Sequence, residues 1–235
     1  MAQTPLDDLN LFSCKVIERD SRVTVIAKDN KRELRVHLRN TGRLNNLIYR
    51  GATVLCERKE NGKTDATVIG VLHDSFPVLL DTYVQEVCFE KAIERELIGC
   101  FPLPDNVKRG FNYEGKSFDF EIQSKNEKEI LEIKSAVTCK NGWASYPDAP
   151  SKRGLEHVNL LSKLSSIGKS VYICFVVTDP RCKKFRPNKK IQPEMAKALS
   201  KAKVKGVKIF AVQMILTVQG SVILKNDSLP VELEV

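Results

Sequence analysis

The sequence lacks long apolar runs and any recognisable export signal. Its longest uninterrupted apolar run, residues 171–177, is far shorter than the roughly 20 residues that a membrane-spanning helix needs. The N-terminus, MAQTPLDDLN, has no basic stretch followed by an apolar one, which is the pattern of a signal peptide. We therefore expect a cytoplasmic protein that does not associate with a membrane.

The sequence also lacks paired cysteines. Its seven cysteines are scattered, and no two of them form a CxxC pair. An odd number without close pairs argues against a zinc site and against a secreted disulfide framework. Several cysteines lie inside apolar runs, as Cys174 does in VYICFVV. We expect them to be small buried hydrophobic residues.

The net charge of +9 comes from one segment. Residues 181–208 hold 11 Lys and Arg but a single acid, Glu194; subtracting them from the totals of 38 and 29 leaves 27 basic and 28 acidic residues elsewhere. Such a concentration is typical of an anion-binding face, and also of a solvated lysine-rich helix. Charge alone leaves both interpretations open.

The N-terminal part of the chain alternates between apolar and polar residues. Five short runs between residues 11 and 72 are separated by turn signals such as Asp29-Asn30 and Asn61-Gly62. This pattern predicts a small barrel, and a five-stranded OB-like barrel is the economical choice at this length. Because the strands carry many arginines, we assign residues 1–78 to a nucleic-acid-binding barrel.

The pattern changes in residues 79–235, where helices and strands follow one another. A helix is expected over residues 82–98 with Thr82 near its N-cap, then a loop over 101–110, and a second helix over 151–167. The remaining predicted elements are strands at 111–113, 116–122, 129–135, 170–177 and 207–213, a helix from Pro193 to about Gly206, and a hairpin around Gly220. The order predicts a mixed α/β sheet flanked by helices.

Charged residues interrupt two of these strands. In KSFDFEI the phenylalanines face one way and Asp119 faces the other, while LEIK places Glu132 and Lys134 on one face. If the hairpin aligns these faces, the three side chains converge. Two carboxylates can hold Mg²⁺ or Mn²⁺, and the ammonium can stabilise charge on a phosphate. The alternative is an ordinary surface ion pair across two strands.

Several separated motifs resemble one known family. HLRNTGRL, SFDF, LEIKSA, YPDAPSKRGLEHVNLL and FRPN occur in this order, and over nearly its whole length the chain resembles the sugar fermentation stimulation protein family. The resemblance implies an OB-fold followed by a domain similar to the PD-(D/E)XK (restriction-endonuclease-like) nucleases. It also implies binding to DNA rather than RNA.

The resemblance assigns candidate catalytic residues. Asp119, Glu132 and Lys134 match the nuclease-like triad, with the two acids as metal ligands. Glu90, on the preceding helix, falls where many such nucleases keep another metal-binding acid. Arg153 and His157 lie four residues apart on one helix face, where both could reach a phosphate or the metal; an ordinary ion pair and a packing histidine are the alternatives.

Further residues are candidates for contact with nucleic acid. Arg39, Asn40 and Arg43 lie around a Gly-containing turn that either contacts phosphate or is purely structural. Asp148 is expected to cap the helix that follows it. The candidate contacts in the C-terminal part are Arg153, Lys183, Lys184, Arg186, Lys189 and Lys190.

Two functions follow from these residues. The first is a DNA-binding protein with a Mg²⁺-dependent nuclease site. The second is a non-catalytic DNA-binding regulator of sugar metabolism genes that uses a nuclease-like fold for binding alone. Two carboxylates that face a polyanion would repel it unless a metal ion compensates them, which favours the first. The residues leave open whether the protein forms a homodimer.

Overall fold

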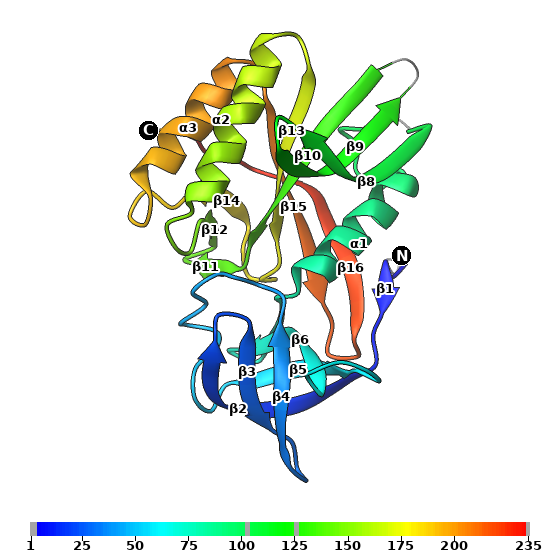
Figure 1. The fold of residues 1–235 in the computed structure, drawn as a ribbon, viewed down its shortest axis with the longest axis vertical. Coiled ribbons are helices and arrows are strands. Elements are labelled where there is room, and N and C mark those ends of the chain that lie inside the picture. The colour runs from blue at the N-terminus through cyan, green and yellow to red at the C-terminus, as the bar shows by residue number, and fades with distance from the viewer. Residues whose placement is uncertain (1–3, 102–103, 125–126, 234–235) are drawn as a thin grey trace.

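The computed structural model describes residues 4–101, 104–124 and 127–233. A β-barrel formed by the first part of the chain lies at one end of the molecule, and a mixed α/β sheet with three helices lies at the other (Figure 1). Among the residues within these ranges, no helix is both long enough and apolar enough to cross a membrane.

The barrel has the five strands that the alternation predicts. They are β2 (Leu11–Ser21), β3 (Thr24–Lys28), β4 (Glu33–Leu38), β5 (Thr53–Arg58) and β6 (Ala66–His73). The order is β4-β3-β2-β5-β6, and a parallel pairing of β4 with β6 closes the barrel. Alternate residues such as Val25, Val36, Val54 and Val68 fill its interior. A sixth strand, β7 (Phe76–Leu79), extends the sheet beyond β6.

The second sheet has the order β1-β16-β15-β13-β10-β9-β8. Its parallel centre consists of β10 (Glu127–Ala136), β13 (Ser170–Val177) and β15 (Lys208–Leu216). The antiparallel strands are β8 (Asn106–Tyr113) and β9 (Lys116–Ser124) on one side and β16 (Ser221–Leu229) and β1 (Asp7–Asp8) on the other. The mixed α/β fold predicted from the sequence is confirmed.

The helices cover both faces of this sheet. Helix α1 (Thr82–Glu94) packs Phe89 against Leu131 and Tyr172 on one face. Helices α2 (Lys152–Ser166) and α3 (Pro193–Val204) pack Leu161 and Leu199 on the opposite face. Because β13 is buried on both faces, its sequence is an apolar run that does not alternate with polar residues.

Three strands depart from the expected elements. β11 (Thr138–Lys140), β12 (Trp143–Tyr146) and β14 (Lys184–Pro187) form a small separate sheet where loops are expected. β8 begins at Asn106, inside the predicted loop, whose residues 102–103 lie outside the described residues. The strands β11, β12 and β14 are three or four residues long and too short to show a clear alternation, and the pairing of β12 with the distant β14 completes their sheet.

The first strand of the chain belongs to the second sheet and not to the barrel. β1 pairs with β16, and the neighbouring Leu6 is 1% exposed in the core beneath α1. The predicted boundary at residue 78 therefore assigns β1 to the barrel, although β1 pairs with the second sheet. The reason is its length, since two residues show no periodicity.

Two cysteines form a disulfide that the sequence does not predict. Cys139 at β11 and Cys182 before β14 are bonded, with their Cα atoms 5.7 Å apart. They are 43 residues apart in sequence, and the small sheet brings them together. Of the free cysteines, Cys100 is exposed and the other four are buried, as expected for small hydrophobic residues.

Asp81 caps helix α1 and joins it to the barrel. Its carboxylate accepts hydrogen bonds from Val84 N (3.0 Å) and from Arg39 Nε (2.6 Å). The expected cap, Thr82, instead donates its hydroxyl to Arg39 O (2.7 Å). Asp81 is 0% exposed, and burial raises its pKa although both donors oppose that rise.

Replacing Asp81 tests this junction. Asp81→Ala removes the cap and leaves the partly exposed Arg39 without its partner, so we expect a loss of about 1–3 kcal/mol in the free energy of unfolding. Asp81→Asn keeps an acceptor for Val84 N and should lose less. Urea denaturation measures both, with exposed Glu60→Ala as a control within about 0.5 kcal/mol of the native protein. A loss in Asp81→Ala no larger than in the control would contradict this role.

Candidate functional site

The hairpin of β9 and β10 brings the predicted acids together. The strands pair in register from Ser124↔Glu127 to Phe120↔Leu131. Beyond that pair a side chain replaces the backbone pairing of the two strands. The Oδ2 atom of Asp119 accepts a hydrogen bond from Ile133 N at 2.6 Å. Asp119 therefore lies beside Glu132 and Lys134, as the alternation of both strands indicates.

Glu132 is a buried anion, and one of its two carboxylate oxygens is bonded to cationic or polar side chains. Its side chain is 3% exposed, and Oε1 is bonded both to Lys134 Nζ and to His157 Nδ1, the latter at 2.6 Å. Burial acts to raise the pKa of this carboxyl, but Lys134 and His157 outweigh burial and the pKa is lowered. Oε2 is buried without a hydrogen-bond partner among the described residues.

Asp119 holds its proton more tightly than an ordinary aspartic acid. Burial and the negative charge of Glu132 raise its pKa to about 7, against the opposing effects of Lys134 and the Ile133 N–H group. The pair thus consists of one carboxylate that stays ionised and one that titrates near neutrality.

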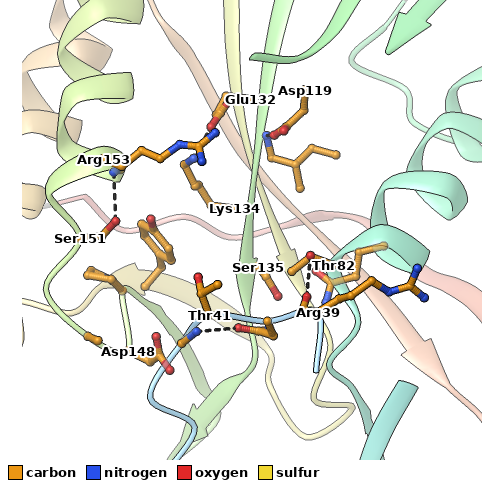
Figure 2. A pocket seen from close by; sticks show the side chains of 18 of the residues that line it. Arg39, Thr41, Thr82, Asp119, Glu132, Lys134, Ser135, Asp148, Ser151 and Arg153 are labelled. Atoms are coloured by element: carbon orange, nitrogen blue, oxygen red, sulfur yellow. Dashed lines mark hydrogen bonds and ion pairs between the residues drawn. The ribbon is translucent and has the colours of Figure 1, made fainter. Parts of the chain in front are cut away.

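A cavity of about 540 Å³ opens above these acids, between the barrel and the second sheet. The turn after β4 forms one wall, and the segment from the end of β12 to the first turn of α2 forms another (Figure 2). Asp119, Glu132 and Lys134 line it together with Arg39, Thr41, Glu86 and Arg153. Both structural units therefore contribute to a single site.

Arg153 and His157 occupy different places although they share a helix face. Arg153 is exposed and extends from α2 toward Glu132 and Lys134 (Figure 2). His157 is 2% exposed, does not line the cavity, and packs its ring 5.3 Å from that of Phe118. Arg153 can therefore contact a ligand directly, whereas His157 acts only through Glu132.

Glu90 lies outside the cavity. Its Oε2 is 2.7 Å from Arg109 Nε, and the acid of helix α1 that lines the cavity is Glu86, one turn earlier. Burial raises the pKa of Glu86, and the charges of Glu132 and Asp81 add to the rise against Arg109. The signal that could have found Glu86 is the helix register set by buried Cys88 and Phe89.

The turn after β4 is held by structural hydrogen bonds. Asn40 is buried, and its side chain bonds Leu80 O and Gly42 N, each at 3.0 Å. Asp148 does not cap α2, because Ser151 does so through Gly154 N (3.0 Å); Asp148 Oδ2 instead accepts from Leu44 N at 3.1 Å.

Gly42 and Arg43 have different surroundings in this turn. A Cβ atom on Gly42 would lie 2.5 Å from Asp148 Oδ2, so a larger residue there would displace the carboxylate that accepts from Leu44 N. Arg43 is exposed and does not line the cavity. The contacts at Gly42 are those of a structural turn, one of the two alternatives that the sequence leaves open.

The five basic residues of the 183–190 stretch lie beside the cavity and not within it. Lys184 and Arg186 sit over the ring of Trp143, at 3.7 Å and 4.6 Å from its centroid. Lys183, Arg186, Lys189 and Lys190 are exposed. Since β14 pairs with β12, which ends at the cavity residue Tyr146, these charges extend from the cavity's edge.

The donor set limits what the site can hold. Across the described ranges, no three His, Cys, Asp or Glu side chains form a group arranged to hold a metal ion. Asp119 and Glu132 lie side by side, and any ion held between them would need further oxygen ligands from the backbone, water or a substrate. Mg²⁺ is commonly bound in this way.

The fold and the site together define a class: an OB-like barrel followed by a mixed α/β domain, with a carboxylate–lysine cluster at their junction. Two family models match the chain, the SfsA N-terminal OB domain over residues 17–80 and the sugar fermentation stimulation protein RE domain over residues 83–220. The chain belongs to the sugar fermentation stimulation protein family.

Individual relatives agree with this assignment. A sugar fermentation stimulation protein homolog from Pyrococcus furiosus is 33% identical over 217 residues, covering 92% of this chain and 94% of that protein. A homolog from Clostridium perfringens is 30% identical over 198 residues, covering 83% and 86%. The solved structure of Pyrococcus furiosus SfsA in complex with Ca²⁺ has a TM-score of 0.94 at 33% identity and covers 97% of this chain and 99% of that one.

The raised pKa of Asp119 predicts a pH-dependent stability. A carboxyl group whose pKa is higher in the folded state stabilises the fold at low pH, and this contribution is lost as pH rises toward the folded value. Asp119→Asn keeps an acceptor for Ile133 N but cannot ionise. Without metal, we expect the variant to gain about 2–3 kcal/mol over the native protein between about pH 5 and pH 8.

Urea denaturation in EDTA at several pH values measures this difference. Other titrating groups are shared by both proteins and largely cancel. A difference that stays constant with pH would show that Asp119 is ionised throughout.

Proposed function

We propose that this protein binds DNA and hydrolyses its phosphodiester bonds with Mg²⁺ or Mn²⁺ held between Asp119 and Glu132. The observation that carries the proposal is Glu132 Oε2, a carboxylate oxygen that is buried without a hydrogen-bond partner among the described residues. Leaving such an oxygen unpaired costs free energy. A cation at this point removes the cost.

The chemistry of the two carboxylates suits a hard cation. Mg²⁺ and Ca²⁺ both prefer oxygen ligands, and Mg²⁺ often uses one or two carboxylates together with water and substrate phosphate. A relative of the same family, Pyrococcus furiosus SfsA, has been solved in complex with Ca²⁺. The ion would polarise the phosphoryl group and make water a stronger nucleophile.

Lys134 supplies fixed positive charge in this proposal. Burial acts to lower the pKa of its ammonium group, but Glu132, Tyr146 and Asp119 together outweigh burial and raise it. A lysine that stays protonated cannot accept the proton of an attacking water. It serves instead to donate a hydrogen bond to that water or to a phosphate oxygen.

The neighbouring residues position the site and the substrate. His157 holds Glu132 Oε1 from the side away from the cavity and is a positioning residue. Arg153, exposed at the cavity, can pair with a phosphate. The exposed cations beside Trp143 offer a path for the rest of the polyanion.

A regulator that only binds DNA is the second candidate. It would need the basic residues alone, and it would gain nothing from two carboxylates in a cavity that faces phosphates. Without a cation, the ionised Glu132 would repel the backbone. The unpaired oxygen therefore favours the catalytic function.

Metal binding gives the first test of the proposal. Titration calorimetry with Mn²⁺ or Ca²⁺ should show binding to the native protein and at least about tenfold weaker binding to Glu132→Gln, because a neutral amide is a poorer ligand. Glu121→Gln is the matched control: this acid lies on the neighbouring strand β9 and pairs with Lys128. Equal affinity in Glu132→Gln and the native protein would place the ion elsewhere.

Cleavage gives the second test. Labelled DNA and RNA, single-stranded and double-stranded, are incubated with Mg²⁺, Mn²⁺ or EDTA. We expect cleavage of DNA that needs metal and falls by at least about a hundredfold in Glu132→Ala. Lys134→Met should bind metal yet cut slowly. Binding without cleavage of any substrate would leave the regulator as the remaining function.

A further inference from the structure

We infer that the strand to be cut enters the cavity unpaired, so that the substrate is single-stranded DNA or an unpaired segment of a duplex. This inference rests on the proposed function. It comes from the shape and construction of the cavity, and three features carry it: a fixed wall from the barrel, acids at the cavity's base, and an apolar surface that lines the cavity beside them.

The wall is residues 39–42 of the barrel, called here the barrel wall. Two arginines of the barrel bind its carbonyl groups: Arg22 Nε donates to Thr41 O at 3.0 Å, and Arg19 Nη2 donates to Gly42 O at 2.8 Å. Two side chains of the second unit hold its ends: the Thr82 hydroxyl donates to Arg39 O (2.7 Å), and Asp148 Oδ2 accepts from Leu44 N, two residues beyond the wall (3.1 Å). A wall with bonds on both sides cannot swing aside without breaking several of them.

The acids lie at the base of this cavity. Glu132 is 3% exposed and Asp119 is partly buried, so a phosphate near them lies within the cavity that the barrel wall also lines. The volume of about 540 Å³ falls within the roughly 300–1,000 Å³ of pockets that enclose one small ligand. Such a space suits a nucleotide of one strand, whereas a paired duplex brings a second strand that the cavity has no room for.

An apolar surface lines the cavity beside the acids. Tyr146, Pro147, Ala149 and Pro150 line the cavity between β12 and α2, and we call them the apolar shelf. A base that has left its stack exposes an apolar face, and enzymes that act on such bases receive them against aromatic and apolar side chains. With Arg39 and Arg153 nearby for phosphates, the cavity offers a surface for each part of an unpaired nucleotide.

Duplexes with one unpaired segment test the inference. A duplex several helical turns long and the same duplex with a short central mismatch bubble are incubated with the native protein and Mn²⁺, and the cuts are mapped on a denaturing gel. In parallel, fluorescence anisotropy measures binding of Glu132→Gln to a single strand and to the matching duplex. We expect cuts confined to the bubble and at least about tenfold tighter binding of the single strand.

A variant with a loosened wall keeps the net charge of the cavity lining. Arg22→Ala combined with Asp148→Ala removes one cation and one anion from that lining, together with the bonds to Thr41 O and Leu44 N, and its preference for the single strand should fall several-fold. Glu60→Ala, far from the cavity's lining, should keep the full preference. Urea denaturation verifies that both variants remain folded.

Each outcome decides between the two proposals. Cuts in the paired flanks at the rate of the bubble, or tighter binding of the duplex, would overturn the unpaired-strand inference and leave the nuclease intact. Preference for the single strand without any cleavage would support the inference and overturn the nuclease. Absence of both binding and cleavage would overturn both.

Discussion

The site depends on the burial of one charge, the carboxylate of Glu132. A buried anion costs several kcal/mol unless partners surround it, and here the partners come from two elements: Lys134 from the same strand and His157 from helix α2. Both bind Oε1 of Glu132, so α2 is fixed to β10. Oε2 has no hydrogen-bond partner in the part of the chain that the structure describes. The high pKa of Asp119 follows in part from this charge. The need to compensate this buried charge thus ties α2 to the strand through His157, raises the proton affinity of Asp119 and leaves Glu132 Oε2 available to a cation.

The features that the sequence predicts well are those set by local periodicity. Alternation in KSFDFEI and LEIKSA indicates two strands and the faces of Asp119, Glu132 and Lys134, because side chains two apart in a strand share a face. The hairpin between them then places the two acids beside each other. The barrel is predictable for the same reason: its strands are short, half-buried and separated by turns. The OB-like barrel and the mixed sheet with three helices are confirmed.

The features that escape prediction arise from contacts between distant segments. Glu86 and Glu90 are one helical turn apart, and only the packing of α1 decides that the first lines the cavity while the second pairs with Arg109. Cys139 and Cys182 meet because a small sheet joins segments that look like loops. Asn40 resembles a ligand-binding residue in sequence, yet the barrel uses its amide to bond Leu80 O. In each case the residue type suggests a role, but the sequence does not reveal which residue it contacts, because that residue lies tens of positions away.

The strand β1 changes how the two units are connected. Because the chain begins in the second sheet, passes through the barrel and returns at α1, the barrel is topologically an insertion tied at both of its ends (Figure 1). A domain joined by one linker can rotate about it, whereas an insertion with two anchors resists rotation. Removing β1 would therefore do more than shorten the chain: it would take away one of the barrel's two anchors and bare the backbone edge of β16 at Ser221 and Val222, a template for pairing with another copy.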